Sequence, residues 1–234
     1  MGKVRSSALS LFGAGVVALV AAHPALADSD VTAPGDPITG IYQTLVGGNS
    51  ITSSVGTNTG QYPAAEAPQF AIDNSTATKY LNFGNGNQNT SAAGKGVGTG
   101  FFVTPASGFS VLTGVHFAAA NDSPERDPLT ITIEGTTATS NLNLGSSWTL
   151  IYSGPTGLAT DPGRNTFGPI QSFLNGAAYT SYRVLISSER DAPINANSVQ
   201  YSEIELIGHL VPAPAGALSL GFAGFVMGAR RRSR

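Results

Sequence analysis

The sequence predicts an all-β fold, an antiparallel β-sandwich in which two sheets pack face to face in a jelly-roll-like manner. Several segments alternate apolar and polar residues with a period of two, which is typical of half-buried strands. Turns rich in Gly, Thr, Ser and Asn separate these segments, and no long helical repeat occurs between residues 28 and 210. Antiparallel strands without helical crossovers bury their apolar faces by stacking two sheets.

Seven or eight strands are expected. The segments that predict them are 38–46, 101–103, 111–117, 129–133, 148–152, 182–186 and 201–207. In the last segment, Ile204 and Leu206 are expected to face the core, while Glu203 and Glu205 face the other way.

Two of these strands allow finer predictions. In segment 111–117, the residues expected on one face are Val111, Thr113, Val115 and Phe117. In segment 148–152, Trp148 lies on the apolar side and is expected to be buried. Helix is expected to be minor, with one short turn at residues 63–70.

Both ends of the chain resemble targeting segments. Residues 1–27 have basic residues first, then an apolar run and a small-residue cleavage site at Ala25-Leu26-Ala27, which is typical of a secretory signal peptide. Residues 213–229 form a largely apolar stretch that is long enough for a transmembrane helix, and an arginine cluster follows it. Between them we expect a leader at residues 28–37 and a sandwich domain at residues 38–210.

The C-terminal segment 211–234 resembles the PEP-CTERM sorting signal of Gram-negative bacteria. Its short motif is Val211-Pro212-Ala213-Pro214, in which Ala213 replaces the usual Glu. The resemblance implies an exosortase substrate that is processed at the inner membrane and delivered to the cell envelope or to an extracellular biofilm matrix. An uncleaved tail anchor is the alternative.

The charge of residues 28–210 excludes some partners. Six basic residues face 14 acidic ones, giving a net charge of −8, which argues against nucleic acid and anionic lipid. The chain has no cysteine, so disulfides and thiolate metal sites are excluded.

The turn at residues 71–83 is the first candidate site. Oxygen-bearing side chains gather there at Asp73, Asn74, Ser75, Thr76 and Thr78. A hard cation such as Ca²⁺ takes six to eight such oxygens. An Asx turn that caps a strand is the alternative interpretation.

Three short motifs resemble the discoidin, or coagulation-factor C-type, domains of the galactose-binding-like superfamily. They are Ala71-Ile72-Asp73-Asn74, Tyr182-Arg183-Val184 and Ser202-Glu203-Ile204-Glu205-Leu206, and the resemblance covers residues 38–208. The sequence departs from the usual pattern in having Asp-Asn-Ser where Asp-Gly-Asp is usual. The resemblance implies a jelly-roll sandwich that serves as a carbohydrate-binding module.

The same resemblance implies a structural Ca²⁺ between the early turn and the last strand. Its ligands would be the carboxylates of Asp73 and Glu203, the hydroxyl or carbonyl of Thr78 and the carbonyl of Ser202.

Catalytic motifs are not found in the sequence. It contains neither His-Glu-x-x-His nor Gly-x-Ser-x-Gly, and His116 is expected to be a solvent-facing strand residue. The glycine-rich stretch 84–100 runs into a strand rather than a helix, so it is interpreted as a surface loop and not as a phosphate site.

The polar loop at residues 121–128 is the second candidate site. Asn121, Arg126 and Asp127 could bind sugar hydroxyls, and the aromatic residues Tyr80 and Phe83 are expected to be exposed as a platform for the ring. In the alternative, Arg126 pairs with Asp122, Glu125 or Asp127 and holds the loop together. Acid/base catalysis by the loop carboxylates is a third option.

These observations favour a non-enzymatic exported protein that binds or organises extracellular polysaccharide through a calcium-stabilised sandwich. A structural or adhesive matrix protein without a ligand site is the alternative, and a polysaccharide-active enzyme is a weaker one.

Overall fold

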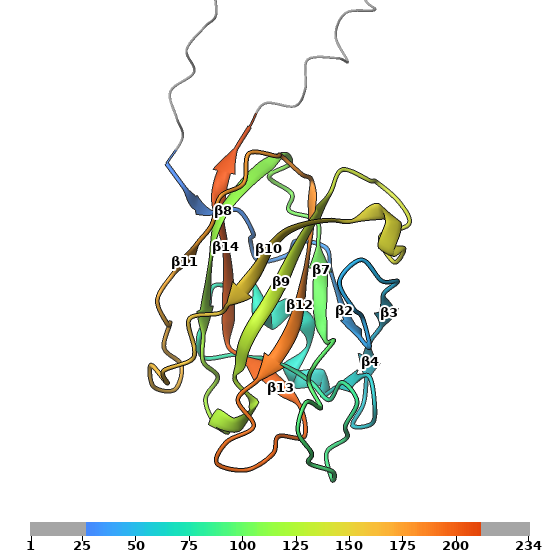
Figure 1. The fold of residues 1–234 in the computed structure, drawn as a ribbon, viewed down its shortest axis with the longest axis vertical. Helices are drawn as coiled ribbons and strands as arrows, with labels where there is room; N and C mark the ends of the chain where they lie inside the picture. Colours follow the sequence, from blue (N-terminus) through green and yellow to red (C-terminus); the bar gives the residue numbers. More distant parts are fainter. Residues whose placement is uncertain (1–26, 212–234) are drawn as a thin grey trace, which may run out of the picture.

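Paired β-strands dominate the structure, a computed structural model that describes residues 27–211 (Figure 1). Apart from Ala27 and Val211, the expected signal peptide and sorting segment lie outside the described residues. Within residues 27–211, no helix is both long enough and apolar enough to span a membrane. Helical structure in this range consists of 3₁₀ turns at η1 (Ala64–Glu66), η2 (Pro68–Ala71), η3 (Pro124–Arg126) and η4 (Gly145–Ser147).

Two antiparallel sheets form the sandwich. The larger contains β2 (Ile38–Tyr42), β3 (Ile51–Thr52), β7 (Gly100–Val103), β9 (Pro128–Thr136), β10 (Thr149–Pro155) and β12 (Ser181–Glu189), in the order β10-β9-β12-β7-β2-β3. The smaller contains β1 (Ser29–Asp30), β8 (Ser110–Ala118), β11 (Gln171–Ser172) and β14 (Glu203–Leu210), in the order β1-β14-β8-β11. The prediction of an all-β antiparallel sandwich is confirmed.

Two short strand pairs complete the fold. β6 (Tyr80–Asn82) pairs antiparallel with β13 (Val199–Tyr201), and β4 (Ser54–Val55) pairs in parallel with β5 (Gln61–Tyr62). Figure 1 shows β1 and the end of β14 side by side at one end of the molecule, in agreement with the pairing of Ser29 with Gly208. The described chain therefore begins and ends on the same side of the sandwich.

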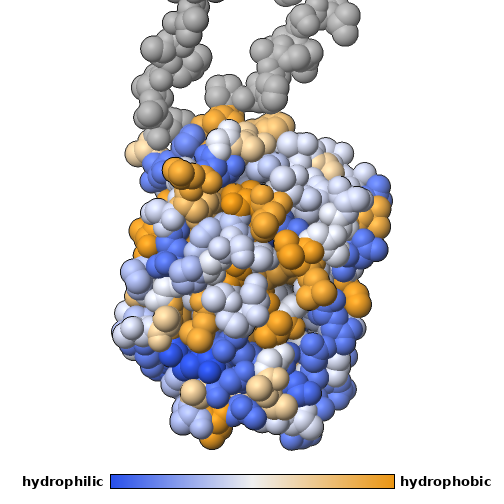
Figure 2. Space-filling model, viewed as in Figure 1, coloured by the Kyte–Doolittle hydropathy of each residue, from blue (hydrophilic) through white to orange (hydrophobic). Residues whose placement is uncertain are grey.

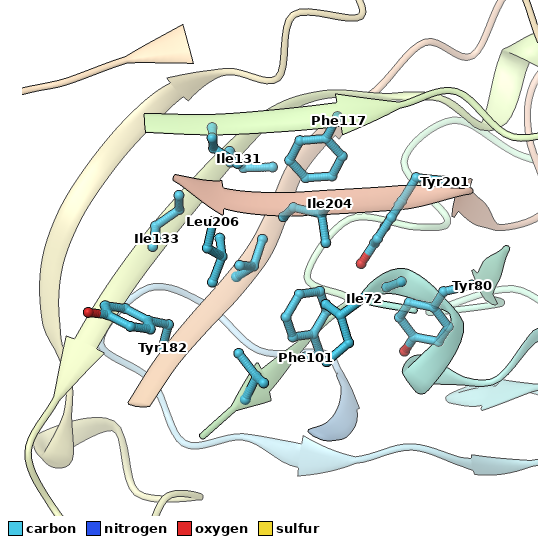
Figure 3. Close-up of a cluster of buried hydrophobic side chains, with 14 of the residues drawn as sticks. Ile72, Tyr80, Phe101, Phe117, Ile131, Ile133, Tyr182, Tyr201, Ile204 and Leu206 are labelled. Carbon is cyan, nitrogen blue, oxygen red and sulfur yellow. The ribbon is translucent and has the colours of Figure 1, made fainter. Parts of the chain in front are cut away.

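The core lies between the two sheets. In β12, Tyr182, Val184 and Ile186 alternate toward it, and in β14 the predicted inward residues Ile204 and Leu206 do the same. Figure 3 shows these strands sending their side chains into one cluster. Complete burial of each large apolar side chain contributes about 1.5–3 kcal/mol, so this alternation holds the sheets together.

One strand departs from the predicted alternation. Ile207 of β14 pairs with Gly114 of β8, but the next residue, Gly208, pairs with Leu112. β8 therefore has one extra residue at this point, and the side of the sheet to which its side chains point is shifted by one residue. Leu112 therefore faces the core together with Val115 and Phe117, while Thr113 is only half-buried. The prediction that Val111 and Thr113 share the core face was wrong, because a bulge breaks the period of two.

The outer face of the larger sheet carries a second buried cluster. The Arg183 guanidinium pairs with Glu134 at 2.7 Å and donates to the Gly48 carbonyl and the Ser50 hydroxyl, while the Trp148 ring covers it at 5.1 Å. Trp148 is buried as predicted, but it lies outside the central core cluster. Leu150 lies on the same outer face, opposite Glu134, and is about half-exposed, although the strand pattern placed it on the apolar side. A bulge between Leu150 and Tyr152 then turns Tyr152 toward the core.

Candidate functional site

The turn before β6 meets the start of β14, so the structure brings Asp73 and Glu203 together. The Ser75 N–H donates to Asp73 Oδ1 and to Glu203 Oε2, at 3.1 Å each. The Thr78 hydroxyl lies 2.7 Å from Asp73 Oδ2. The bond from Ser75 to Asp73 is that of an Asx turn, which was the alternative interpretation of this segment.

Burial raises the pKa of Glu203. Its side chain is almost completely buried, and burial, together with the nearby charge of Asp73, raises its pKa to about 8 even though Ser75 donates to it. A cation would remove this cost, because it would neutralise both carboxylates. Two carboxylates and a hydroxyl at one point therefore fit a hard cation as a partial set of ligands.

The fourth ligand that the resemblance implies is the backbone carbonyl of Ser202. Ser202 is fully buried, and its hydroxyl donates to the Ala119 carbonyl at 2.9 Å. Within residues 27–211, no group of three or more His, Cys, Asp or Glu side chains is positioned to hold a metal ion. A cation at Asp73 and Glu203 would thus need carbonyl or water oxygens to complete its shell.

The expectation that Tyr80 and Phe83 form an exposed aromatic platform was wrong. Tyr80 is 1% exposed and Phe83 is 5% exposed. The Tyr80 ring packs edge-to-face on Tyr201, with centroids 5.7 Å apart, and its hydroxyl accepts a hydrogen bond from Asn82. Pairing of β6 with β13 turns Tyr80 into the core, where it cannot stack on a sugar.

The loop at residues 121–128 is built around Asp127, which is fully buried. Arg164 binds both of its carboxylate oxygens, at 2.8 and 2.7 Å, and Arg190 approaches it at 3.3 Å. Asp127 is therefore a structural anchor, and the prediction that it faces a sugar was wrong.

Arg126 does not take the predicted role of holding this loop. Within the described residues its guanidinium makes no ion pair, and its Nε is buried without a hydrogen-bond partner. Arg164 and Arg190, both distant in sequence, hold the loop carboxylate instead.

Sequence reasoning missed a buried lysine next to this loop. Lys79 is 9% exposed, and its ammonium lies 3.0 Å from Asp122 Oδ1, 3.0 Å from Gln200 Oε1 and 3.5 Å from Glu66 Oε1. Burial acts to raise the pKa of Asp122, but the bonds from Lys79 and Gln200 outweigh it and hold the pKa below its usual range. A lysine directly before an apolar strand gave no signal that its partners would come from three separate segments.

This network forms the wall of a polar cavity of about 210 Å³. Its lining consists of Ala65, Glu66, Ala77, Thr78, Lys79 and Asn121. The cavity lies between the two candidate sites of the sequence analysis, because Thr78 belongs to the turn at residues 71–83 and Asn121 belongs to the loop at residues 121–128. It offers fixed polar groups beside small apolar ones, which suits a small hydroxylated ligand.

A larger cavity of about 340 Å³ lies on the outer face of the six-stranded sheet. Its walls are mostly apolar and include Leu45, Val46, Val97, Leu185 and Ile186. Figure 2 shows that apolar surface on the face in view is interrupted by polar residues. This groove lacks the charged and amide groups that recognise sugar hydroxyls.

His116 is not the solvent-facing residue that the sequence predicted. Its ring stacks on Phe167, with centroids 4.2 Å apart, and its nitrogens lie 2.8 Å from Glu205 Oε2 and 2.8 Å from the Gly168 carbonyl. The side chain is 19% exposed. His116 joins the segment at residues 167–168 to the smaller sheet.

Comparison with known proteins gives matches only among solved structures. No protein-family model matches the chain, and no curated protein does. The similar structures include several family 32 carbohydrate-binding modules.

Three of these structures illustrate the level of similarity. The module of Clostridium perfringens NanJ in complex with galactose has 11% identity and a TM-score of 0.44, with 73% of this chain and 99% of that chain covered. A module from a C. perfringens family 31 glycoside hydrolase has 12% identity and a TM-score of 0.46, with 68% and 90% covered. The module of Streptococcus pneumoniae EndoD has 7% identity and a TM-score of 0.45, with 78% and 100% covered. Similarities this low do not transfer a ligand, so the site rests on its own geometry.

Proposed function

We propose that residues 38–210 form a non-enzymatic carbohydrate-binding module with a galactose-binding-like jelly roll, and that it binds extracellular polysaccharide in the cavity beside Lys79. The observation that carries this proposal is the cavity itself. Glu66 and Asn121 present polar groups there, and the buried network around Lys79 holds the wall in place. Preorganised polar groups in a small concavity favour binding of hydroxyl-rich ligands.

The chemistry of the cavity favours binding over hydrolysis. Glycoside hydrolysis needs two carboxyl groups that flank the bond and have different protonation states. The two carboxylates nearest the cavity, Glu66 and Asp122, both contact the same Lys79 ammonium. Such a shared ion pair fixes both charged side chains in place.

A bound calcium ion is part of this proposal. Asp73, Glu203 and Thr78 would hold it, with the Ser202 carbonyl that the discoidin resemblance implies. The ion would supply the positive charge that the two carboxylates lack. It would also fix the turn that places Thr78 and Lys79 at the cavity.

The location of the protein is also a proposal. The terminal segments support export, sorting by an exosortase at the inner membrane, and delivery to the envelope or extracellular matrix. The net negative charge of residues 28–210 disfavours nucleic acid as a partner there.

A binding assay on polysaccharides and oligosaccharides tests the proposed function. Asn121→Ala and Glu66→Ala should weaken binding of any bound glycan about tenfold, because each removes a hydrogen bond or charge from the cavity. Asn143→Ala and Glu125→Gln are matched controls outside the cavity lining and should leave affinity unchanged. Wild-type protein that binds no glycan would refute the proposal.

A further inference from the structure

A buried hydroxyl without a partner lies in the wall of the apolar groove on the six-stranded sheet. Thr132 lines this groove and is 8% exposed, and within residues 27–211 its Oγ1 has no hydrogen-bond partner. The polar residues next to it on the outer face of β9 are both paired. Thr130 bonds to the Ser188 hydroxyl at 2.6 Å, and Glu134 pairs with Arg183 at 2.7 Å. Because an unbonded buried hydroxyl is costly, the groove has an unmet need for a hydrogen-bond acceptor.

The loop that follows β2 forms the rim of this groove and is fixed at both ends. The Thr44 N–H donates to the Gly98 carbonyl at 2.9 Å, and the Gly47 N–H donates to a carboxylate oxygen of β9 at 2.9 Å. Between these two bonds, Leu45 and Val46 are 72% and 50% exposed. The rim is therefore held over the sheet with its apolar side chains unburied, so the groove is organised before any ligand enters.

The lining limits the chemistry of a ligand. None of the lining residues is charged and none is aromatic; they are Thr44, Leu45, Val46, Val97, Gly98, Thr132, Leu185, Ile186 and Ser187. A sugar ring lacks here the aromatic face and the set of polar groups that sugar sites use. An ionic group would lose its hydration without gaining a counter-charge. An aliphatic chain, in contrast, buries apolar surface against these walls, so the groove suits a neutral aliphatic ligand.

We propose that this groove binds neutral aliphatic acyl groups, with the carbonyl oxygen accepting a hydrogen bond from Thr132 and the chain lying against Leu185. A carbonyl supplies the missing acceptor without adding a donor that would need a partner of its own. The Thr132 hydroxyl is shielded from solvent, which strengthens a bond made there. The proposal is independent of glycan binding beside Lys79, because the two cavities share no lining residue.

Nuclear magnetic resonance on the isotope-labelled full chain tests the proposal. The protein is titrated with methyl hexanoate, a neutral acyl ester, and separately with the hexanoate anion. The buffer contains no detergent, because a detergent alkyl chain would compete for the groove. We expect the ester to shift the amide signals of Gly98 and Ser187, while those of Thr78 and Asn121 at the other cavity stay in place. The anion should bind more weakly, because the lining offers it no positive charge.

Three variants separate binding from folding. Thr132→Val keeps the shape of the side chain but removes the hydroxyl, so it should weaken ester binding about fivefold, the size of one neutral hydrogen bond. Without ligand it should be at least as stable as wild type, because no bond is lost. The matched control Thr130→Val should lower stability, since it leaves Ser188 unpaired, and should leave affinity unchanged. Val46→Asp places a charge on the exposed rim and should abolish binding.

The outcomes that overturn the proposal are distinct. Signals of Gly98 and Ser187 that stay in place up to the solubility limit of the ester would show that the groove takes no acyl group. Equal affinity of Thr132→Val and wild type would remove the hydroxyl from the site. Tighter binding of the anion than of the ester would contradict the neutral preference. Glycan titrations of Thr132→Val should match wild type, so a failure here leaves the proposed carbohydrate function standing.

Discussion

Asp73 and Glu203 are far apart in the sequence, yet both accept a hydrogen bond from the same Ser75 N–H. Two carboxylates that share one donor repel each other, and this repulsion contributes to the raised pKa of Glu203. The fold therefore keeps an unfavourable pair of charges near the candidate cavity. A bound cation would turn this repulsion into attraction.

The first prediction is that calcium stabilises the protein. At a calcium concentration of 100 times the dissociation constant, the free energy of unfolding should rise by about 2.7 kcal/mol, because the ion binds only the folded state. The melting temperature of the chelated protein should be lower by roughly 5–10 °C. Differential scanning calorimetry with and without chelator measures both.

The control for this prediction is Glu203→Gln. It removes one proposed ligand and also the repulsion with Asp73, so the chelated variant should be at least as stable as the chelated wild type. Added calcium should no longer raise its melting temperature. Identical melting curves for wild type with calcium and with chelator would show that no cation binds.

The second prediction concerns pH. Burial raises the pKa of Glu189 from 4.5 to about 7, although the Gly96 N–H donates to it. The folded state therefore holds this proton more tightly than the unfolded state. The resulting stabilisation is complete below pH 4.5 and is lost as the pH rises to about 7.

Urea unfolding at a series of pH values tests this prediction. Wild type should lose stability between pH 5 and pH 8, and Glu189→Gln should lose less over the same range, because the amide does not titrate. Glu203 titrates in the same direction in both proteins, so the difference between them isolates Glu189. Parallel pH profiles for the two proteins would contradict the assignment.

A side chain on Gly96 would collide with this carboxylate, so Gly96→Ala should also be destabilising.

The third prediction concerns the buried pair Arg183–Glu134. Arg183→Met should destabilise the protein by about 3–5 kcal/mol, because it leaves the Glu134 carboxylate buried without its partner. The double variant Arg183→Met with Glu134→Gln should recover part of this loss. Chemical denaturation of the two single variants and the double variant gives the coupling energy. Additive losses would mean that the two charges do not stabilise each other.

The sequence was sufficient to predict the sandwich because most strands keep a strict alternation. Ile204 and Leu206 face the core as expected, and the residues of β12 alternate in the same way. It was insufficient for β8 and β10, where bulges shift the alternation by one residue. A bulge depends on the partner strand, so the pattern within one strand does not reveal it.

The candidate site was only partly predictable for a similar reason. The meeting of Asp73 with Glu203 followed from the family resemblance and is seen in the structure. The roles of Lys79 and Asp127 were not foreseen, because their hydrogen-bond partners come from segments 37 to 121 residues away in the chain. Nothing local distinguishes a carboxylate that faces solvent from one that binds a distant arginine.

The fourth prediction separates the structural role of Tyr80 from a role in binding. Tyr80→Phe keeps the ring but removes the hydroxyl that bonds to Asn82 and to the Gly100 carbonyl. Because these buried groups lose their partner, the free energy of unfolding should fall by about 1–2 kcal/mol. Glycan affinity should not change, since the ring lies in the core and away from the cavity lining. A variant of unchanged stability that binds glycan more weakly would show instead that the Tyr80 hydroxyl reaches the ligand, and it would move the binding site from the Lys79 cavity to β6.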